Sequence, residues 1–115
     1  SNCVVYTGTH DNDTTCGWFR KANDTEKSFL KRYAHIDGQD INWNLIRLGS
    51  QSVADLAIFP FQDVLGIGSE GRMNYPGKPK GNWEWRFTWD RVKPEHAQHL
   101  YEITALYERC SSTRM

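Results

Sequence analysis

Apolar and polar positions alternate along the chain in patterns that predict strands and helices in turn. Residues 3–7 form a short run of β-branched and aromatic side chains, which predicts a buried strand. Residues 53–61 are mostly apolar and end near a proline, which predicts a second buried strand or a strand at a sheet edge. Residues 83–87 alternate Trp or Phe with charged side chains, so we expect a third, half-buried strand there.

Two central segments have the spacing of amphipathic helices. Residues 24–36 place apolar side chains at helical intervals between basic ones, and Asn23 with Glu26 has the spacing of a capping box. Residues 41–48 repeat the pattern, with Asp40 as the expected N-cap and the following glycine as the expected end of the helix.

The last third of the chain predicts a long loop and one more helix. Residues 66–81 are rich in glycine and proline, which favours a surface loop, and loops of this length usually carry function. A helix is expected to open at Pro94, with an apolar stripe formed by Leu100, Ile103, Tyr107 and Cys110. The alternation of strands and helices predicts an α/β fold in a single segment over residues 1–115.

Composition narrows the classes of function. The chain has 115 residues, of which 38% are hydrophobic and 24% charged, as in a folded soluble domain. Fourteen basic residues balance fourteen acidic ones, which disfavours a nucleic-acid partner, and no uncharged run approaches the ~20 residues of a membrane span. Three cysteines without CxxC spacing favour a reducing compartment. Because a strand follows the first residues at once and no Met precedes it, we expect a piece of a longer polypeptide.

Several short motifs point to chemistry that the surrounding residues oppose. GIGSEG at 66–71 matches a dinucleotide fingerprint, but the prolines and glycines after it forbid the helix that such a site needs. His96 and His99 would share a helix face but lack a third metal ligand nearby. Asp11 and Asp13 have calcium-loop spacing without the acidic residue at the twelfth position. We therefore predict no metal site.

The polar loop at residues 9–13 (THDND) is the strongest local signal. It places an imidazole, two carboxylates and an amide directly after a predicted strand, where sites form in α/β barrels and open sheets. Asp and Asn side chains that merely cap the backbone of a turn would give the same pattern, and both interpretations stay open. The five Trp and five Tyr could stack on sugar or base faces, although packing in the core is the favoured role for most of them.

Three blocks of sequence together resemble the amylomaltase family of 4-α-glucanotransferases, also called disproportionating enzymes (glycoside hydrolase family 77). They stand in the family's order and are VVYTGTHDNDTT at 4–15, PFQDVLG at 60–66 and RMNYPG at 72–77 with GNWEWR at 81–86. The resemblance covers about residues 3–110. It implies the C-terminal portion of a (β/α)₈ TIM barrel carrying about the last two barrel strands and their helices.

The same resemblance implies an activity. Such enzymes cleave an α-1,4 bond of a malto-oligosaccharide or starch-like glucan and transfer the freed segment to another glucan with retention, which requires a nucleophilic carboxylate and an acid/base carboxylate. No residues here match the motifs of those two groups, so we expect the isolated chain to be inactive. No cofactor is implied, and the expected location is the cytoplasm, with a plastid as the alternative.

The resemblance also assigns site residues. Asp11 matches the aspartate that holds sugar hydroxyls and stabilises the transition state, and His10 matches a histidine that binds the same sugar. Asn74 matches a loop asparagine near the acceptor. Cys16 stands where the family usually has an aliphatic residue, and Gly71 where it often has Ala.

Two further expectations follow. Two strands taken from an eight-stranded barrel leave unpaired edges and an uncovered apolar face, so the chain alone is expected to self-associate. The rival function is a non-catalytic carbohydrate-binding module, in which Trp83 and Trp85 rather than Asp11 would carry the affinity.

Overall fold

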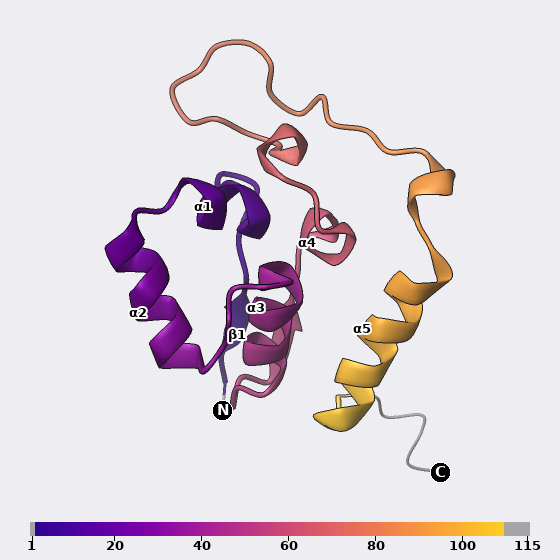
Figure 1. Cartoon of the computed structure of the whole chain (residues 1–115). Helices are drawn as coiled ribbons and strands as arrows, with labels where there is room; N and C mark the ends of the chain where they lie inside the picture. The colour runs from indigo at the N-terminus through magenta and orange to yellow at the C-terminus, as the bar shows by residue number, and fades with distance from the viewer. Residues whose placement is uncertain (1, 110–115) are drawn as a thin grey trace.

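The computed structural model describes residues 2–109, so the predicted stripe residue Cys110 lies outside the described part. Figure 1 shows the order of the elements, which are β1 (Val4–Tyr6), α1 (Thr15–Lys21), α2 (Asp24–Ala34), α3 (Ile41–Ser50), β2 (Leu56–Ile58), α4 (Phe61–Leu65), the 3₁₀ turns η1 (Ser69–Gly71) and η2 (Trp89–Arg91), and α5 (Pro94–Leu106). None of these helices is long and apolar enough to cross a membrane.

Strands β1 and β2 lie side by side in parallel, in the register that pairs Val5 with Ala57. The chain returns from one strand to the other through helices, which confirms the predicted α/β class. One face of the pair lies against α3, where Gly49 brings the helix backbone close to Val5 and Phe59. The absence of a side chain at Gly49 permits this approach, since a Cβ there would lie 3.0 Å from the Phe59 ring.

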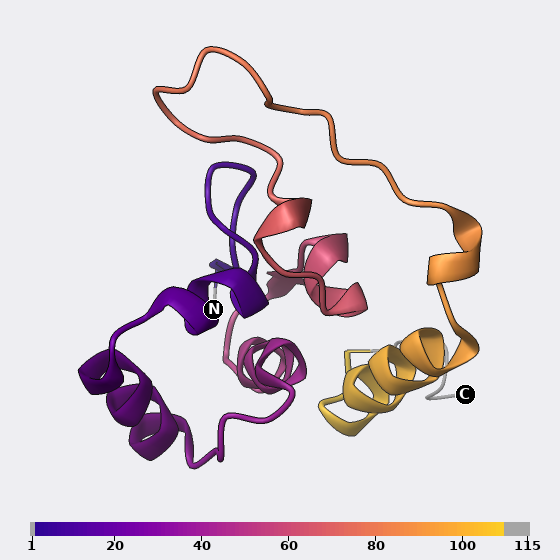
Figure 2. The ribbon, with the colours of Figure 1, turned by 45° about the horizontal axis from the view of Figure 1, so that its top comes forward.

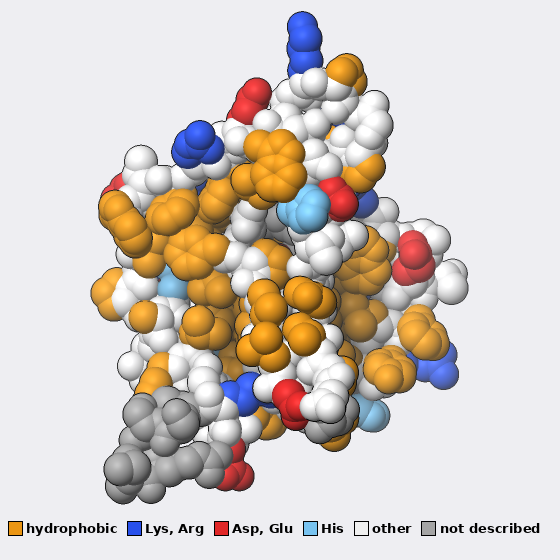
Figure 3. Space-filling view, turned by 180° about the vertical axis from the view of Figure 1, so that it is seen from behind, with side chains coloured by type: hydrophobic (Ala, Val, Ile, Leu, Met, Phe, Trp, Pro, Cys, Tyr) orange, Lys and Arg blue, Asp and Glu red, His pale blue; other side chains and the backbone are white. Residues whose placement is uncertain are grey.

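The other face of the two strands is open. Val4, Tyr6, Leu56 and Ile58 point to this face and are each 43–52% exposed. The prediction that both strands are buried is therefore wrong for this face. Figure 3 shows hydrophobic side chains gathered across the middle of the molecule on its rear surface. A β-branched run reports strand propensity, whereas burial depends on what packs against it.

The hydrophobic core lies between α3, α4 and α5. Its buried centre is formed by Ile46, Val64 and Ile103, with Trp43, Phe59, Leu100 and Tyr107 packed around it. The predicted stripe on the last helix is thus confirmed for its three described members. Arg109 donates to the carbonyl oxygens of Ser50, Ser52 and Ala54 and so joins the end of α5 to the turn after α3.

The predicted start of helix α2 is confirmed, but the apolar face expected of an amphipathic helix is not buried. The Asn23 side chain accepts from the Glu26 amide at 2.8 Å, and the Glu26 carboxylate accepts from the Asn23 amide at 3.1 Å, which completes the capping box. No α2 residue is buried. Phe29 and Tyr33 stack on each other with ring centroids 5.9 Å apart, although both are largely exposed.

Other element predictions need correction. Residues 83–87 form no strand, because in the described structure this segment has no strand to pair with. The Trp85 ring stacks on that of Phe87, which meets Trp89 edge-on. Figures 1 and 2 show this segment arching away from the helices before α5 returns to them. Helices α1 and α4 were not predicted, and α3 continues through Gly49 to Ser50. Asp40 holds the N-cap position but makes no side-chain cap bond.

Candidate functional site

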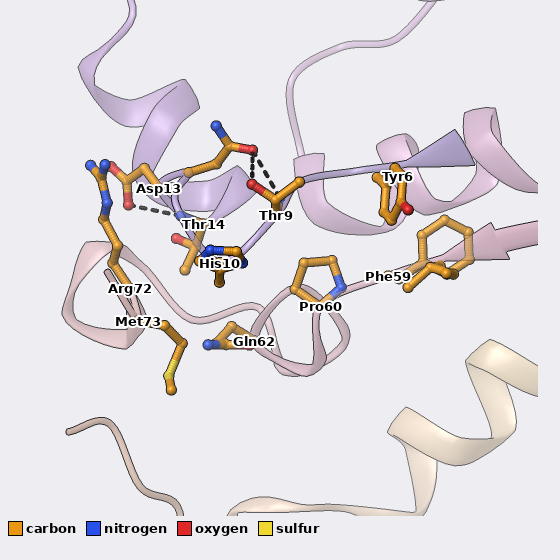
Figure 4. A pocket seen from close by; sticks show the side chains of 13 residues that line it. Tyr6, Thr9, His10, Asp13, Thr14, Phe59, Pro60, Gln62, Arg72 and Met73 are labelled. Carbon is orange, nitrogen blue, oxygen red and sulfur yellow. Dashed lines mark hydrogen bonds between the residues drawn. The ribbon is translucent and has the colours of Figure 1, made fainter. Parts of the chain in front are cut away.

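A pocket of about 550 Å³ opens at the carboxyl ends of the two parallel strands. Figure 4 shows Tyr6, Phe59 and Pro60 on one side of it and Asp13 and Arg72 on the other. His10 lies between these two sides, with Gln62 and Met73 beside it, also along the lining (Figure 4). The loop after β1 and the segment after β2 both contribute, as expected where parallel strands end at one edge.

One buried carboxylate holds the loop after β1 in place. Asp63 is 1% exposed and accepts hydrogen bonds from Thr7 Oγ1 at 2.8 Å, from Thr15 Oγ1 at 2.7 Å and from the Thr15 amide at 2.9 Å. Its own backbone carbonyl accepts from the Asn42 side chain at 2.7 Å. The loop is thereby fixed at both of its ends, at the end of β1 and at the start of α1.

Two polar residues of the loop serve the backbone, as the capping interpretation predicted. Asn12 Oδ1 accepts from the amide and the hydroxyl of Thr9 at 2.8 and 3.0 Å. Asp13 Oδ1 accepts from the Thr14 amide, and its Oδ2 accepts from Ser69 Oγ at 2.8 Å. The capping interpretation therefore holds for these two residues. The side chains of His10 and Asp11 are not used in this way, and their role as site residues stays a prediction.

The three residues that the sequence predicts as a site come together. Asn74 Nδ2 donates to Asp11 Oδ1 at 2.6 Å, although 63 positions separate them. His10 Nε2 lies 3.3 Å from the same oxygen. The side chains of His10 and Asp11 are 56% and 49% exposed, so solvent or a ligand reaches the group.

Arg72 joins the two loops and was not singled out by sequence reasoning. Its Nη2 donates to the backbone carbonyl of Asp11 at 2.7 Å, and its Nε donates to the carbonyl of Asn74 at 2.9 Å. The guanidinium also stacks over the Tyr75 ring, 4.6 Å from its centroid. Asp63 was missed as well. Because Asp63 reaches Thr7 and Thr15 across 56 and 48 positions and Arg72 reaches Asp11 across 61, no local pattern marks these bonds.

The weaker sequence candidates make other contacts within the fold. Within GIGSEG itself Ser69–Gly71 form a 3₁₀ turn, and residues 72–88 after it form no helix. His99 stacks on Trp43 with ring centroids 3.9 Å apart. His96 Nδ1 accepts from the Lys93 amide at the start of α5. Within residues 2–109, no three His, Cys, Asp or Glu side chains gather as a metal site would require. Burial raises the pKa of the Cys16 thiol, which keeps it protonated and a poor nucleophile at neutral pH.

Comparison with known proteins decides the family. The family model described as 4-alpha-glucanotransferase matches residues 1–92. The chain belongs to this family. It is 51% identical to the 4-alpha-glucanotransferase of Thermus thermophilus over 112 residues, and 51% identical to that of Synechocystis over 109. These alignments cover 92% and 94% of the chain but 22% of each relative, so the chain spans about a fifth of their length.

A solved structure agrees with the sequence comparison. The amylomaltase of Streptococcus agalactiae in complex with acarbose matches with a TM-score of 0.87 and 30% sequence identity. The match covers 91% of this chain and 21% of that one. The resemblance stated from the three sequence blocks is therefore confirmed, and so is the expectation that the chain corresponds to only part of a family member.

Proposed function

We propose that the chain is the C-terminal portion of a 4-α-glucanotransferase and supplies part of its glucan-binding site. The convergence of His10, Asp11 and Asn74 at the carboxyl ends of two parallel strands carries this proposal. Membership of the family and the acarbose bound by a structural neighbour support a glucan as the ligand. In this proposal β1 and β2 are the last two strands of a (β/α)₈ barrel.

Asp11 is the residue that stabilises the transition state in this proposal. Among the described residues, His10 and Asn74 both contact its Oδ1, which leaves Oδ2 to accept hydrogen bonds from sugar hydroxyls. Charge-assisted bonds to ring hydroxyls strengthen as positive charge develops on the sugar. One such bond lowers the activation barrier by about 2–4 kcal/mol, which raises the rate by a factor of about 10²–10³.

The chain lacks the rest of the machinery that this chemistry needs. Retention requires a nucleophilic carboxylate and an acid/base carboxylate about 5–5.5 Å apart, and we propose that both belong to the part of the protein that this chain does not span. The isolated chain is then inactive, and its open apolar sheet face makes it self-associate. No metal or organic cofactor has a role in this reaction scheme.

The deciding experiment uses maltotriose. The 115-residue chain and the full-length polypeptide that contains it are each incubated with maltotriose, and the products are separated by chain length. We expect glucose and longer oligomers from the full-length protein alone. Products from the isolated chain would show a complete site within it, and an inactive full-length protein would contradict the assigned activity.

Substitution of the proposed transition-state residue tests the site within that assay. In the full-length protein, Asp11→Asn is expected to lower kcat about 10²–10³-fold. Asp24→Asn is the matched control, since Asp24 is exposed at the start of α2. If Asp11→Asn keeps wild-type kcat, Asp11 has no part in the reaction.

The carbohydrate-binding module remains the second candidate, because Trp83 is 52% exposed. Trp85, the other residue of that alternative, is half-buried. A module would bind glucans as the isolated chain, and Asp11→Asn would leave that affinity unchanged. Isothermal titration of the isolated chain with maltoheptaose separates the two functions. We expect no binding by the Asp11→Asn variant, whereas a binding module would keep its affinity.

A further inference from the structure

Trp83 has a backbone conformation that bulky residues rarely adopt. Its φ is 60°, in the left-handed region. Three other described non-glycine residues share this region, and each adjoins a helix end, namely His35 after α2, Asp40 before α3 and Glu108 after α5. Helix termination explains His35 and Glu108, and Asp40 is a residue type that enters this region readily. Trp83 adjoins no helix, and such outliers concentrate at functional sites.

The surrounding loop enforces this conformation. The Trp83 amide donates to the carbonyl oxygen of Met73 at 2.5 Å and closes the loop that contains residues 73–83. Inside the loop, Asn82 Oδ1 accepts from the Tyr75 amide at 2.8 Å, and Asn82 Nδ2 donates to the Lys78 carbonyl at 2.8 Å. These bonds fix the backbone on the N-terminal side of Trp83, so the position of the residue is determined before any ligand arrives.

The loop delivers the indole to the proposed site. The Trp83 ring lies 5.1 Å from the His10 ring, centroid to centroid, with the planes tilted by 32°. His10 in turn contacts Asp11, and the same loop sends Asn74 to the Asp11 carboxylate. Trp83 is 52% exposed, so the ring is not a core residue. A large, flat and open aromatic surface therefore stands beside the polar group.

We propose that Trp83 is a substrate-binding residue whose indole stacks on the apolar face of a glucosyl unit next to the unit held by His10 and Asp11. This inference rests on the proposed function and deepens it. Pyranose rings expose C–H groups on one face and hydroxyls at the edge, so a flat ring complements the first and Asp11 the second. Because the loop is closed in advance, little conformational freedom is lost on binding.

Trp89 provides the matched control within the same segment. It is 76% exposed, and its ring contacts Phe87 edge-on. The described ring contacts of Trp89 include no residue of the His10, Asp11 and Asn74 group. If stacking at the site contributes to affinity, replacement of Trp83 should weaken glucan binding and replacement of Trp89 should not.

The test compares Trp83→Ala, Trp83→Phe and Trp89→Ala in the full-length protein. We expect Trp83→Ala to raise KM for maltotriose and the Kd of acarbose by roughly five- to tenfold, with kcat within about twofold. Trp83→Phe keeps a flat ring and should restore most of the affinity. Trp89→Ala should match the parent protein in all three quantities.

Two results would overturn the inference. One is a parent protein that transfers glucan segments and a Trp83→Ala variant with unchanged KM and acarbose Kd. The other is a fall in kcat with KM and Kd unchanged, because the ring would then only hold His10 in position. If Trp83→Ala does not fold, Trp83→Leu replaces it, and affinity equal to that of Trp83→Phe contradicts stacking. A parent protein without transfer activity would instead refute the proposed function itself.

Discussion

The loop end of the molecule, formed by the segments that follow β1 and β2, is held by polar contacts, whereas the open face of the sheet is apolar and uncovered. At the loop end, the segment after β1 and the segment after β2 are joined by side-chain hydrogen bonds, with Asp63 fully buried among its donors. At the open face, Val4, Tyr6, Leu56 and Ile58 line up across the strand pair and are about half exposed. The polar network closes on itself, whereas the apolar face has no cover within residues 2–109.

The loops are stabilised by contacts within this chain, whereas the apolar strand face is not covered by any part of it that the structure describes. Hydrogen bonds saturate when each donor meets its acceptor, so the loops around the pocket need nothing further. The free energy gained from apolar burial is proportional to the area buried, and it requires a second surface to pack against. The open strand face and the rings of Phe29 and Tyr33 on α2 remain exposed. The contacts that shape the site are therefore complete within residues 2–109, whereas the apolar face of the strands is not covered by them.

Removal of the buried carboxylate should break the loop end most severely. Asp63→Ala strands the hydroxyls of Thr7 and Thr15 and the Thr15 amide without an acceptor, which costs about 3–5 kcal/mol of the free energy of unfolding. Urea unfolding of the isolated chain measures it. Asp24→Ala, at an exposed carboxylate, is the control. A loss of less than 1 kcal/mol would mean that Asp63 does not hold the loop.

A methyl group at Gly17 should strain the same region by a smaller amount. An added Cβ would lie 2.6 Å from Asp13 Oδ1 and closer still to Ser69 Oγ, so Gly17→Ala is expected to cost about 1–3 kcal/mol. Gly8→Ala is the matched control, because its Cβ would meet its nearest neighbour at an ordinary 3.7 Å. Thermal melting of both variants gives the comparison. The combination with Ser69→Ala should recover part of the loss, and equal melting of the two single variants would contradict the tight fit.

A charge on the open sheet face should change stability least. Leu56→Lys places an ammonium at a position that is already 52% exposed, so we expect the free energy of unfolding to change by less than about 0.5 kcal/mol. The same change should reduce self-association of the isolated chain, measured by light scattering across a concentration series. Lys31→Leu on exposed α2 is the reverse control and should not reduce it. A parent chain that stays monomeric at high concentration contradicts the proposed self-association.

Much of the fold could be predicted because its signals are local. The capping box of Asn23 and Glu26 lies within four residues, and the stripe of Leu100, Ile103 and Tyr107 follows one helix. The short helices α1 and α4 were missed because each holds one or two turns and has no room for a repeating pattern. The strand predicted at residues 83–87 was wrong because an extended, unpaired chain shows the same alternation.

The sequence by itself determined the helices and strands with local signals, the family, and the identity of His10, Asp11 and Asn74 as candidates. Only the tertiary structure decided which carboxylate is buried, which strand face is open, and where the Trp83 ring lies. The reason is distance along the chain. Asp63 meets its partners 56 and 48 positions away, and Asn74 meets Asp11 across 63. Contacts of that range leave no period in the sequence, so they appear only when the chain is folded.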